Sequence, residues 1–268
     1  MSDRAFKEII WKHYRRNRRL FSWRERITPY RIFISEVMLQ QTQVSRVEQF
    51  FPKFVKSFPS FRALASAPVS RVLGAWHGLG YNRRALNLKR AAEIVAKDFK
   101  GRLPQDREAL EALPGIGPNT AGSILAFAFN LPVPFIETNI RRTYLHHYFP
   151  KKQSVSDREL LTVIHRTLDI KNPREWYYAL MDYGSALPKK TKHNPNTRSR
   201  HYAKQPAFKG SARELRGKVL ALALERQQIS LAALARELGI SPARGTAIAR
   251  TLAREGFFTF SRGLIKVE

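Results

Sequence analysis

Apolar residues recur at three- and four-residue spacing over much of the first 187 residues. This spacing predicts helices, most clearly in residues 32–51, 84–95, 120–129 and 157–168, which are separated by turns containing Gly or Pro. No convincing alternation of apolar and polar residues, as in a half-buried strand, occurs in this part of the sequence. The pattern therefore predicts an all-α domain over residues 1–187.

The pattern changes in residues 188–210. This stretch contains many Lys and Arg side chains and almost no aliphatic ones, which is typical of a basic linker. Such a linker is either a solvated tether or a segment that lies along phosphates. The basic composition of the whole chain favours the second interpretation.

Periodic apolar residues return in 211–268, which we expect to form a second, smaller domain. Helices are predicted over 212–224, 231–238 and 242–254. Ser230 is the expected N-cap of the second helix, and Gly239 and Gly256 are the expected ends of the second and third.

A hairpin follows, with strands at 257–260 and 264–267 around Arg262 and Gly263. Three helices and a hairpin resemble a winged helix-turn-helix. The second helix of the helix-turn-helix pair, predicted over 242–254, would carry Arg244, Arg250 and Arg254. We expect this domain to contact DNA. The alternative is a module for packing or for protein contacts.

Charge changes the picture most. The chain has 48 Lys and Arg against 21 Asp and Glu, a net charge of +27, while its hydrophobic fraction of 43% suffices for a core. Such an excess predicts a polyanionic partner, and nucleic acid is favoured because clustered basic residues neutralise phosphates. An anionic membrane surface is disfavoured because no long apolar run or basic amphipathic anchor is present.

The sequence contains no cysteine, which excludes disulfides, Cys-ligated zinc and Cys-ligated iron–sulfur clusters. The N-terminal residues lack the apolar core of a signal peptide. We therefore expect a cytoplasmic, nucleoid-associated protein.

The sharpest local motif runs from Leu113 to Gly122. Gly115 and Gly117 permit a tight turn with outward-facing N–H groups, and Pro118 suits the first turn of the following helix. Such a turn at a helix N-terminus can bind a DNA phosphate. With the preceding helix, at about residues 106–113, it forms a predicted helix-hairpin-helix. The alternative is a plain helix–helix turn.

Several motifs together resemble the MutY-type adenine DNA glycosylases of the helix-hairpin-helix superfamily. They are the run from Ile34 to Val44, Leu79-Gly80-Tyr81 with Arg84, the hairpin above, and the run from Met181 to Gly184. Their order and spacing match over about residues 6–187. The resemblance implies a mainly α helix-hairpin-helix glycosylase fold, here followed by the small winged helix-turn-helix-like domain.

The resemblance implies specific roles for residues of the first motif and its surroundings. Glu36 would protonate the adenine ring and then activate water, and its apolar neighbours would raise its pKa. Arg24 would contact the adenine. Gln40, Gln41 and Tyr81 would enter the duplex when the base flips out, although a lone tyrosine also suits a core.

Asn119 occupies the position where lyase relatives carry a nucleophilic lysine. Because Asn cannot form a Schiff base, we expect base removal without strand scission. Lys89 or Lys97 would restore lyase activity only if the fold brought one of them into the site.

The second carboxylate departs from the family pattern. The family has an Asp followed by Gly-Asn, whereas this chain has Glu137 two residues before Asn139, so the charge lies about 1.5 Å further out. Displacement on that scale can slow a reaction strongly. Glu137 and Asn139 stay in the predicted catalytic set, and Asp182 is the fallback acid.

The family's four cysteine cluster ligands are missing after residue 184, so the resemblance is to a form without an iron–sulfur cluster, and no metal or cofactor is expected. Basic residues there could present charge to phosphates without metal; they are Lys189, Lys190, Lys192, Arg198 and Arg200. Three histidines are interpreted as surface or packing residues: His146, His147 and His193.

The sequence has no room for the family's C-terminal domain, which reads 8-oxoguanine. We expect a monomeric, monofunctional DNA glycosylase that acts on double-stranded DNA containing a mismatch or lesion, and we expect it to remove adenine opposite guanine or 8-oxoguanine. Two alternatives are a thymine or uracil mismatch glycosylase on the same fold and a catalytically silent DNA-binding protein.

Overall fold

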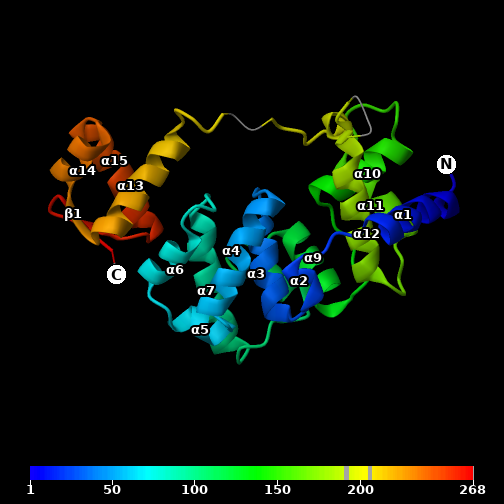
Figure 1. The fold of residues 1–268 in the computed structure, drawn as a ribbon, viewed down its shortest axis with the longest axis horizontal. Helices are drawn as coiled ribbons and strands as arrows, with labels where there is room; N and C mark the ends of the chain where they lie inside the picture. The colour runs from blue at the N-terminus through cyan, green and yellow to red at the C-terminus, as the bar shows by residue number, and fades with distance from the viewer. Residues whose placement is uncertain (190–192, 205–206, 268) are drawn as a thin grey trace. The chain divides into compact units, whose positions relative to one another are not determined.

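The computed structural model describes residues 1–189, 193–204 and 207–267. The chain divides into two compact units, coloured along the sequence in Figure 1. Unit 1 consists of Met1–Glu36, Gln105–Ala112 and Ile116–Lys204. Unit 2 consists of Val37–Pro104, Leu113–Gly115 and the described part of 205–268.

Unit 1 is built from helices. They are α1 (Asp3–Asn17), α2 (Ser22–Glu25), most of α3 (Pro29–Leu39), α8 (Arg107–Glu111), α9 (Pro118–Phe129), α10 (Thr138–Tyr148), α11 (Asp157–Thr167), α12 (Pro173–Ala186) and the 3-10 helices η1 (Leu187–Lys189) and η2 (Pro195–Arg198). Among its described residues the single β pairing is an isolated bridge between Val155 and Ser199. The helical prediction for this part of the chain is confirmed.

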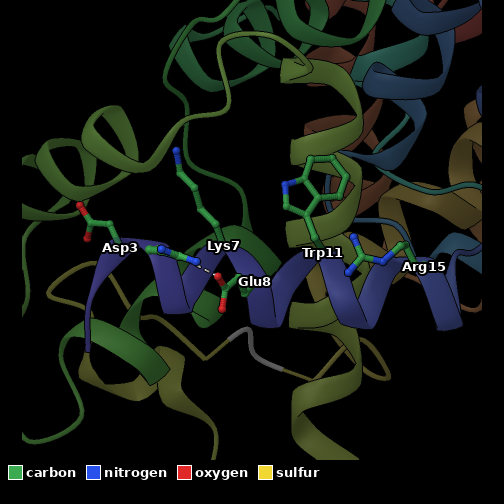
Figure 2. A pocket seen from close by; sticks show the side chains of 6 residues that line it. Asp3, Lys7, Glu8, Trp11 and Arg15 are labelled. Atoms are coloured by element: carbon green, nitrogen blue, oxygen red, sulfur yellow. Dashed lines mark hydrogen bonds and ion pairs between the residues drawn. The ribbon is translucent and has the colours of Figure 1, made fainter.

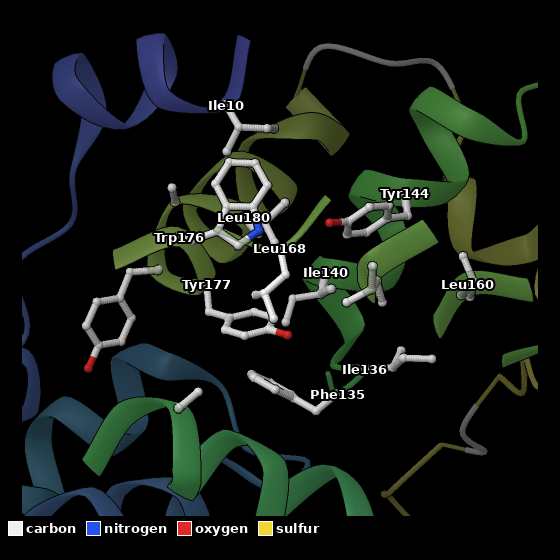
Figure 3. Close-up of a cluster of buried hydrophobic side chains, with 14 of the residues drawn as sticks. Ile10, Phe135, Ile136, Ile140, Tyr144, Leu160, Leu168, Trp176, Tyr177 and Leu180 are labelled. Carbon is white, nitrogen blue, oxygen red and sulfur yellow. The ribbon is translucent and has the colours of Figure 1, made fainter. Parts of the chain in front are cut away.

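The core of unit 1 lies between α1, α10, α11 and α12. Buried aromatic residues dominate it, and Figure 3 shows Phe135, Tyr144, Trp176 and Tyr177 among them. Helix α12 contacts both α1 and α10. Helix α10 is anchored in this core by Ile140, Tyr144 and Leu145, so its N-cap residue, Glu137, is held by a rigid element.

Unit 2 contains the remaining elements. They are the end of α3, α4 (Val44–Ser57), α5 (Phe61–Ser66), α6 (Val69–Trp76), α7 (Arg83–Asp98), α13 (Ala212–Arg226), β1 (Gln228–Ser230), α14 (Leu231–Leu238), α15 (Pro242–Glu255), β2 (Thr259–Ser261) and β3 (Leu264–Lys266). Fully buried Phe51, Phe54, Phe58 and Trp76 fill the core of its first part. None of the helices in the described parts of the chain is long and apolar enough to cross a membrane.

The periodic stretch 32–51 forms two helices, α3 and α4, instead of the single helix that its spacing suggests. Helix α3 ends because Arg84, on α7, donates to the free carbonyls at its C-terminus, those of Val37 and Met38, and to that of Gln40. A side chain more than forty residues away therefore determines where this helix ends.

The C-terminal part of unit 2 has the elements expected for the winged helix-turn-helix, with one additional strand. Ser230 caps α14 through the Ala233 N–H, and Gly239 and Gly256 end α14 and α15 with φ of 62° and 90°. The strands form an antiparallel sheet in the order β1-β3-β2. Strand β1 was not predicted because its three residues are too few for a recognisable alternation.

Candidate active site

Glu36 lies near the end of α3, directly after the buried residues 32–35. Burial raises the pKa of Glu36 to about 7. A hydrogen bond with the Ser123 hydroxyl lowers this pKa, the negative charge of Glu137 raises it, and the positive charge of Arg24 lowers it. Glu36 is therefore a carboxyl that still holds a proton near neutral pH.

Glu137 is the N-cap of α10. Its Oε2 accepts the backbone N–H groups of Asn139 at 2.7 Å and Ile140 at 3.3 Å, and its Oε1 accepts the Asn139 amide Nδ2–H at 2.8 Å. Shorter side chains usually cap helices, so the longer glutamate folds back over the first turn to reach these donors. The extra methylene that distinguishes Glu from Asp is taken up by this local geometry.

A second layer of contacts fixes Asn139. Arg142 donates through Nη1 to the Asn139 Oδ1 at 2.8 Å and to the Gly184 carbonyl at 2.9 Å. With its oxygen held in this way, the Asn139 amide can only present its N–H to Glu137. Gly184 belongs to this arrangement, since a Cβ there would lie 2.2 Å from the Asn139 carbonyl oxygen. Helices α10 and α12 can approach this closely because residue 184 is glycine.

The two carboxyls lie in different environments. Burial raises the pKa of Glu137 as well, but its N–H donors and the Arg142 charge oppose that shift and favour the ionised form. For Glu36, Ser123 is the one hydrogen-bond donor identified among the residues that the structure describes. Two neighbouring carboxyls that differ in this way can act as a proton donor and a negative charge. Glycosidic bond cleavage needs both, one for the leaving group and one for the sugar cation.

Arg24 and Asp182 form a buried ion pair between α2 and α12. Arg24 Nη1 lies 3.0 and 3.1 Å from the two carboxylate oxygens, and Asp182 also accepts the backbone N–H and the Nε–H of Arg19. The Arg24 guanidinium stacks over the Tyr178 ring at 4.2 Å. Asp182 is thus fully engaged in structure. The charge of Arg24 still acts on Glu36, and its contact with a base stays a prediction.

Two of the residues predicted to enter the duplex lie in strained backbone. Gln41 and Tyr81 adopt φ of 55° and 48°, which non-glycine residues rarely do, although five other such residues occur elsewhere in the described chain. Gln41 is exposed, and Tyr81 is 38% exposed. The Gln40 side chain donates to the Gly115 carbonyl at 3.1 Å, which ties the segment that carries Gln40 and Gln41 to the hairpin.

Arg84 connects the segments that carry Gln40 and Tyr81, a role that the sequence did not reveal. Besides the carbonyls at the end of α3, its guanidinium donates to the Thr42 hydroxyl and to the Gly80 carbonyl. Burial lowers the pKa of Arg84 to about 10. Because one rigid group bridges both segments, their separation is fixed by Arg84.

The hairpin between α8 and α9 adopts the expected turn. Gly115 has φ of 81°, and a Cβ there would meet the Asn87 side chain at 2.9 Å. Gly117 and Asn119 are exposed at the start of α9, where backbone N–H groups are available to a phosphate. Asn119 also accepts the Ile136 N–H through Oδ1 at 3.1 Å, next to Glu137 in sequence.

Lys89 does not provide a free amine. Its ammonium donates to the Ala65 carbonyl at 2.9 Å and to Glu93 at 2.6 Å, and the residue is 9% exposed. The buried amine is therefore used in packing α7 against α5.

The segment that replaces the family's cluster loop is held to α10 by polar contacts. Buried Asn196 donates to the Thr138 carbonyl at 3.2 Å, and Arg198 donates to the Leu145 carbonyl at 2.8 Å. The residues present do not fit an iron–sulfur cluster, because the chain has no cysteine. In the described residues no group of His, Asp or Glu could hold a metal ion either.

The basic residues of this segment differ in exposure. Arg200 is exposed, whereas Arg198 is half-buried and has a structural contact that its charge alone did not suggest. Lys190 and Lys192 lie outside the described residues, and Lys189 ends η1. Binding of phosphates by this segment stays a prediction.

Two other features of unit 1 do not involve Glu36 or Glu137: the packing of His147 and a surface groove along α1. His147 contacts the Tyr183 hydroxyl at 2.8 Å, and its ring packs on Phe6, as expected for a packing residue. Figure 2 shows the shallow groove, which is lined by side chains of α1 that include Lys7 and Trp11. It contains none of the predicted site residues.

Comparisons with known proteins identify the family of the central part of the chain. Residues 34–165 match the sequence profile of the HhH-GPD superfamily of base excision DNA repair proteins. This segment belongs to that superfamily. The predicted resemblance to MutY-type glycosylases and the helix-hairpin-helix glycosylase fold are confirmed.

Two curated relatives are named adenine DNA glycosylase. That of Buchnera aphidicola subsp. Baizongia pistaciae is 34% identical over 193 residues, covering 70% of this chain and 54% of that protein. That of Mycobacterium tuberculosis strain H37Rv is 42% identical over 135 residues, covering 50% and 44%. The chain thus spans about half the length of these relatives.

A solved structure, that of a thermostable thymine-DNA glycosylase, aligns with a TM-score of 0.61. It is 25% identical in sequence, and the alignment covers 68% of this chain and 86% of that chain. The same fold therefore serves a protein named for another base.

Proposed function

We propose that this chain is a monofunctional DNA glycosylase that removes adenine from duplex DNA in which the adenine lies opposite guanine or 8-oxoguanine. The observation that carries the proposal is the carboxyl pair. Glu36 has a pKa raised to about 7, and Glu137 accepts three N–H groups at the start of α10. The relatives named adenine DNA glycosylase support the choice of base.

In this proposal Glu36 gives its proton to the leaving purine and then receives one from water. Glu137 stays ionised and stabilises the positive charge that develops on the sugar. Asn139 and Arg142 keep the Glu137 carboxylate in place. Asn119 offers no amine, so the product is an abasic site in an unbroken strand.

The proposed partner is double-stranded DNA that contains a mismatch or lesion. In this proposal a monomer binds it in the cytoplasm, without an iron–sulfur cluster or other cofactor. The net charge of +27 supports a DNA partner. The hairpin supplies N–H groups for one phosphate, and Gln41 and Tyr81 are placed on strained, exposed segments suited to entering a duplex.

A thymine or uracil mismatch glycosylase is the second candidate. It is favoured by the structural likeness to the thymine-DNA glycosylase and by Glu137, which departs from the aspartate of the adenine enzymes. A catalytically silent DNA-binding protein is the third candidate. The chain retains both carboxyls, Glu36 and Glu137, and Asn139 supports Glu137, which argues against this candidate.

Single-turnover assays on four duplexes separate these candidates: adenine opposite 8-oxoguanine, adenine opposite guanine, thymine opposite guanine and uracil opposite guanine. We expect strand breaks on the adenine duplexes only after alkali, and none with Glu36→Gln, which should still bind. Cleavage confined to thymine or uracil would support the second candidate. Binding without cleavage of any duplex would support the third, and breaks without alkali would contradict monofunctional chemistry.

A further inference from the structure

The C-terminal residues 211–267 form a small folded domain with its own core. Its three helices and strands β1 and β3 contribute buried residues, including Leu220, Leu234, Leu252 and Ile265. Helices α13, α14 and α15 contact one another (Figure 1). Strands β1 and β2 pair on either side of β3. We propose that this domain is a second binding site for double-stranded DNA, in which α15 enters the major groove. This proposal does not depend on the glycosylase activity.

Helix α15 has two distinct faces. Gly245, Ala249 and Leu252 are buried against the rest of the domain. On the opposite side, Ala243, Ala247, Arg250 and Arg254 are all exposed and lie within about 60° of one another around the helix axis; these four residues are the exposed face of α15. Its N-terminal half carries small side chains that allow close approach of the backbone, and its C-terminal half carries two guanidinium groups. This division suits insertion into a groove lined by phosphates.

The arginines of α15 are not neutralised within the domain. Arg244, Arg250 and Arg254 make no ion pair with any residue that the structure describes. Three acidic residues of the domain pair with other basic residues: Glu214 with Lys218, Glu237 with Arg226, and Glu255 with Arg216 and Arg83. The positive charge of this face is therefore available to an external anion.

The hairpin adds a second exposed basic element. Arg262 and Gly263 form its turn with φ of 49° and 74°, the left-handed pair that a tight two-residue hairpin requires. Arg262 is exposed at the tip, and Lys266 is exposed on β3. Both can reach a phosphate without any change of the backbone.

Double-stranded DNA fits these features better than other anions. The B-form major groove admits an α-helix, whereas the major groove of duplex RNA is too narrow for side chains to read. Ser241 caps α15 and Pro242 opens it, so the helix end that would enter first is rigid. An acidic protein partner would account for the exposed arginines but not for the small exposed residues Ala243 and Ala247.

The test uses the full chain and undamaged duplex DNA, with affinity measured between about 50 and 200 mM salt. The variant is Arg250→Ala/Arg254→Ala, which alters two exposed side chains. The matched control is Lys218→Ala/Arg226→Ala, which removes the same charge from α13, where both side chains pair with acids of the domain. We expect the variant to lose about tenfold or more in affinity at low salt and to flatten the log–log salt slope by roughly 2.

The control should keep a slope close to that of the unchanged protein, and duplex RNA should compete poorly. Single-turnover cleavage at saturating enzyme should be the same in all three proteins, so a failure here is distinct from a failure of the proposed chemistry. Equal losses in variant and control, no loss in either, or competition by duplex RNA as strong as that by DNA would each overturn the proposal.

Discussion

Glu36 combines a raised pKa with a position among buried residues, and this has a consequence for stability. The pKa of its carboxyl rises from an ordinary 4.5 to about 7 on folding, so between these values the folded protein binds more protons than the unfolded one. The contribution of Glu36 to the free energy of unfolding is therefore most favourable below about pH 4.5 and is lost as pH rises to about 7.

The substitution Glu36→Gln removes this dependence. We expect the variant to be more stable than the unchanged protein at pH ~8, by up to about 3 kcal/mol, and to lose that advantage by pH ~4. Urea unfolding at both pH values measures this. Glu8→Gln, at an exposed ion pair with Arg4, is the control and should change stability by less than about 1 kcal/mol. A Glu36→Gln advantage that does not depend on pH would contradict a raised pKa.

Arg142 acts on Glu137 both through Asn139 and through its charge, which lowers the Glu137 pKa. In Arg142→Ala we expect the Glu137 pKa to rise, so that the acid limb of the pH–rate profile moves to higher pH. Single-turnover rates across pH measure the limb.

The control is the neighbouring Arg141→Ala. Arg141 pairs with Asp157 and donates to the Ser199 hydroxyl. Its loss should lower stability without moving the acid limb. Equal movement in both variants would show that Arg142 acts only through stability of the fold.

At the scale of elements, the close approach of α10 and α12 depends on Gly184. A Cβ at this position would lie 2.2 Å from the Asn139 carbonyl oxygen, a backbone atom that cannot move away alone. We expect Gly184→Ala to lower the free energy of unfolding by at least about 2 kcal/mol and to slow cleavage, because the N-terminus of α10 must shift.

Gly217, inside α13, is the matched control because a Cβ there would have no neighbour within 4 Å. Gly217→Ala should raise stability by about 0.5–1 kcal/mol through the higher helix propensity of Ala. Chemical unfolding and single-turnover rates check both variants. A Gly184→Ala protein that is as stable and active as the unchanged one would contradict the role given to this contact.

Local sequence signals predicted the ends of several elements well. Ser230 and Gly239 bound α14 as expected, and Gly256 ends α15, because caps and left-handed glycines act through neighbouring backbone groups alone. By contrast, the end of α3 depends on Arg84, which lies on α7, and the additional strand β1 depends on pairing with β3. In both cases the partner lies elsewhere in the sequence, so the segment itself contains no signal.

The candidate site shows the same division. Glu36 and Glu137 were found from motif and residue type, but the groups that act on Glu36 come from distant segments. Ser123 on α9 and Arg24 on α2 reach Glu36 through the tertiary fold, whereas the partners of Glu137 lie on α10 itself. The pairing of Arg24 with Asp182, 158 residues apart, was likewise not predictable from spacing.

At the scale of the whole molecule, a net charge of +27 accompanies a pair of buried carboxyls, Glu36 and Glu137, in different environments. By our proposal, backbone N–H groups of the hairpin and exposed basic residues of the C-terminal domain bind DNA. The carboxyl pair is proposed to perform the chemistry. The pH dependence of cleavage tests that proposal, since it requires a protonated Glu36 and an ionised Glu137.

The most direct measurement is the single-turnover rate of adenine removal opposite 8-oxoguanine as a function of pH. We predict a bell-shaped profile whose alkaline limb has its midpoint near 7, the pKa of Glu36, and whose acid limb lies above the ordinary carboxyl value of 4.5. In Glu36→Gln the cleavage activity should be lost, and the alkaline limb should be lost with it. A rate that stays constant well above pH 7, or activity that survives Glu36→Gln, would contradict the assignment of Glu36 as the proton donor.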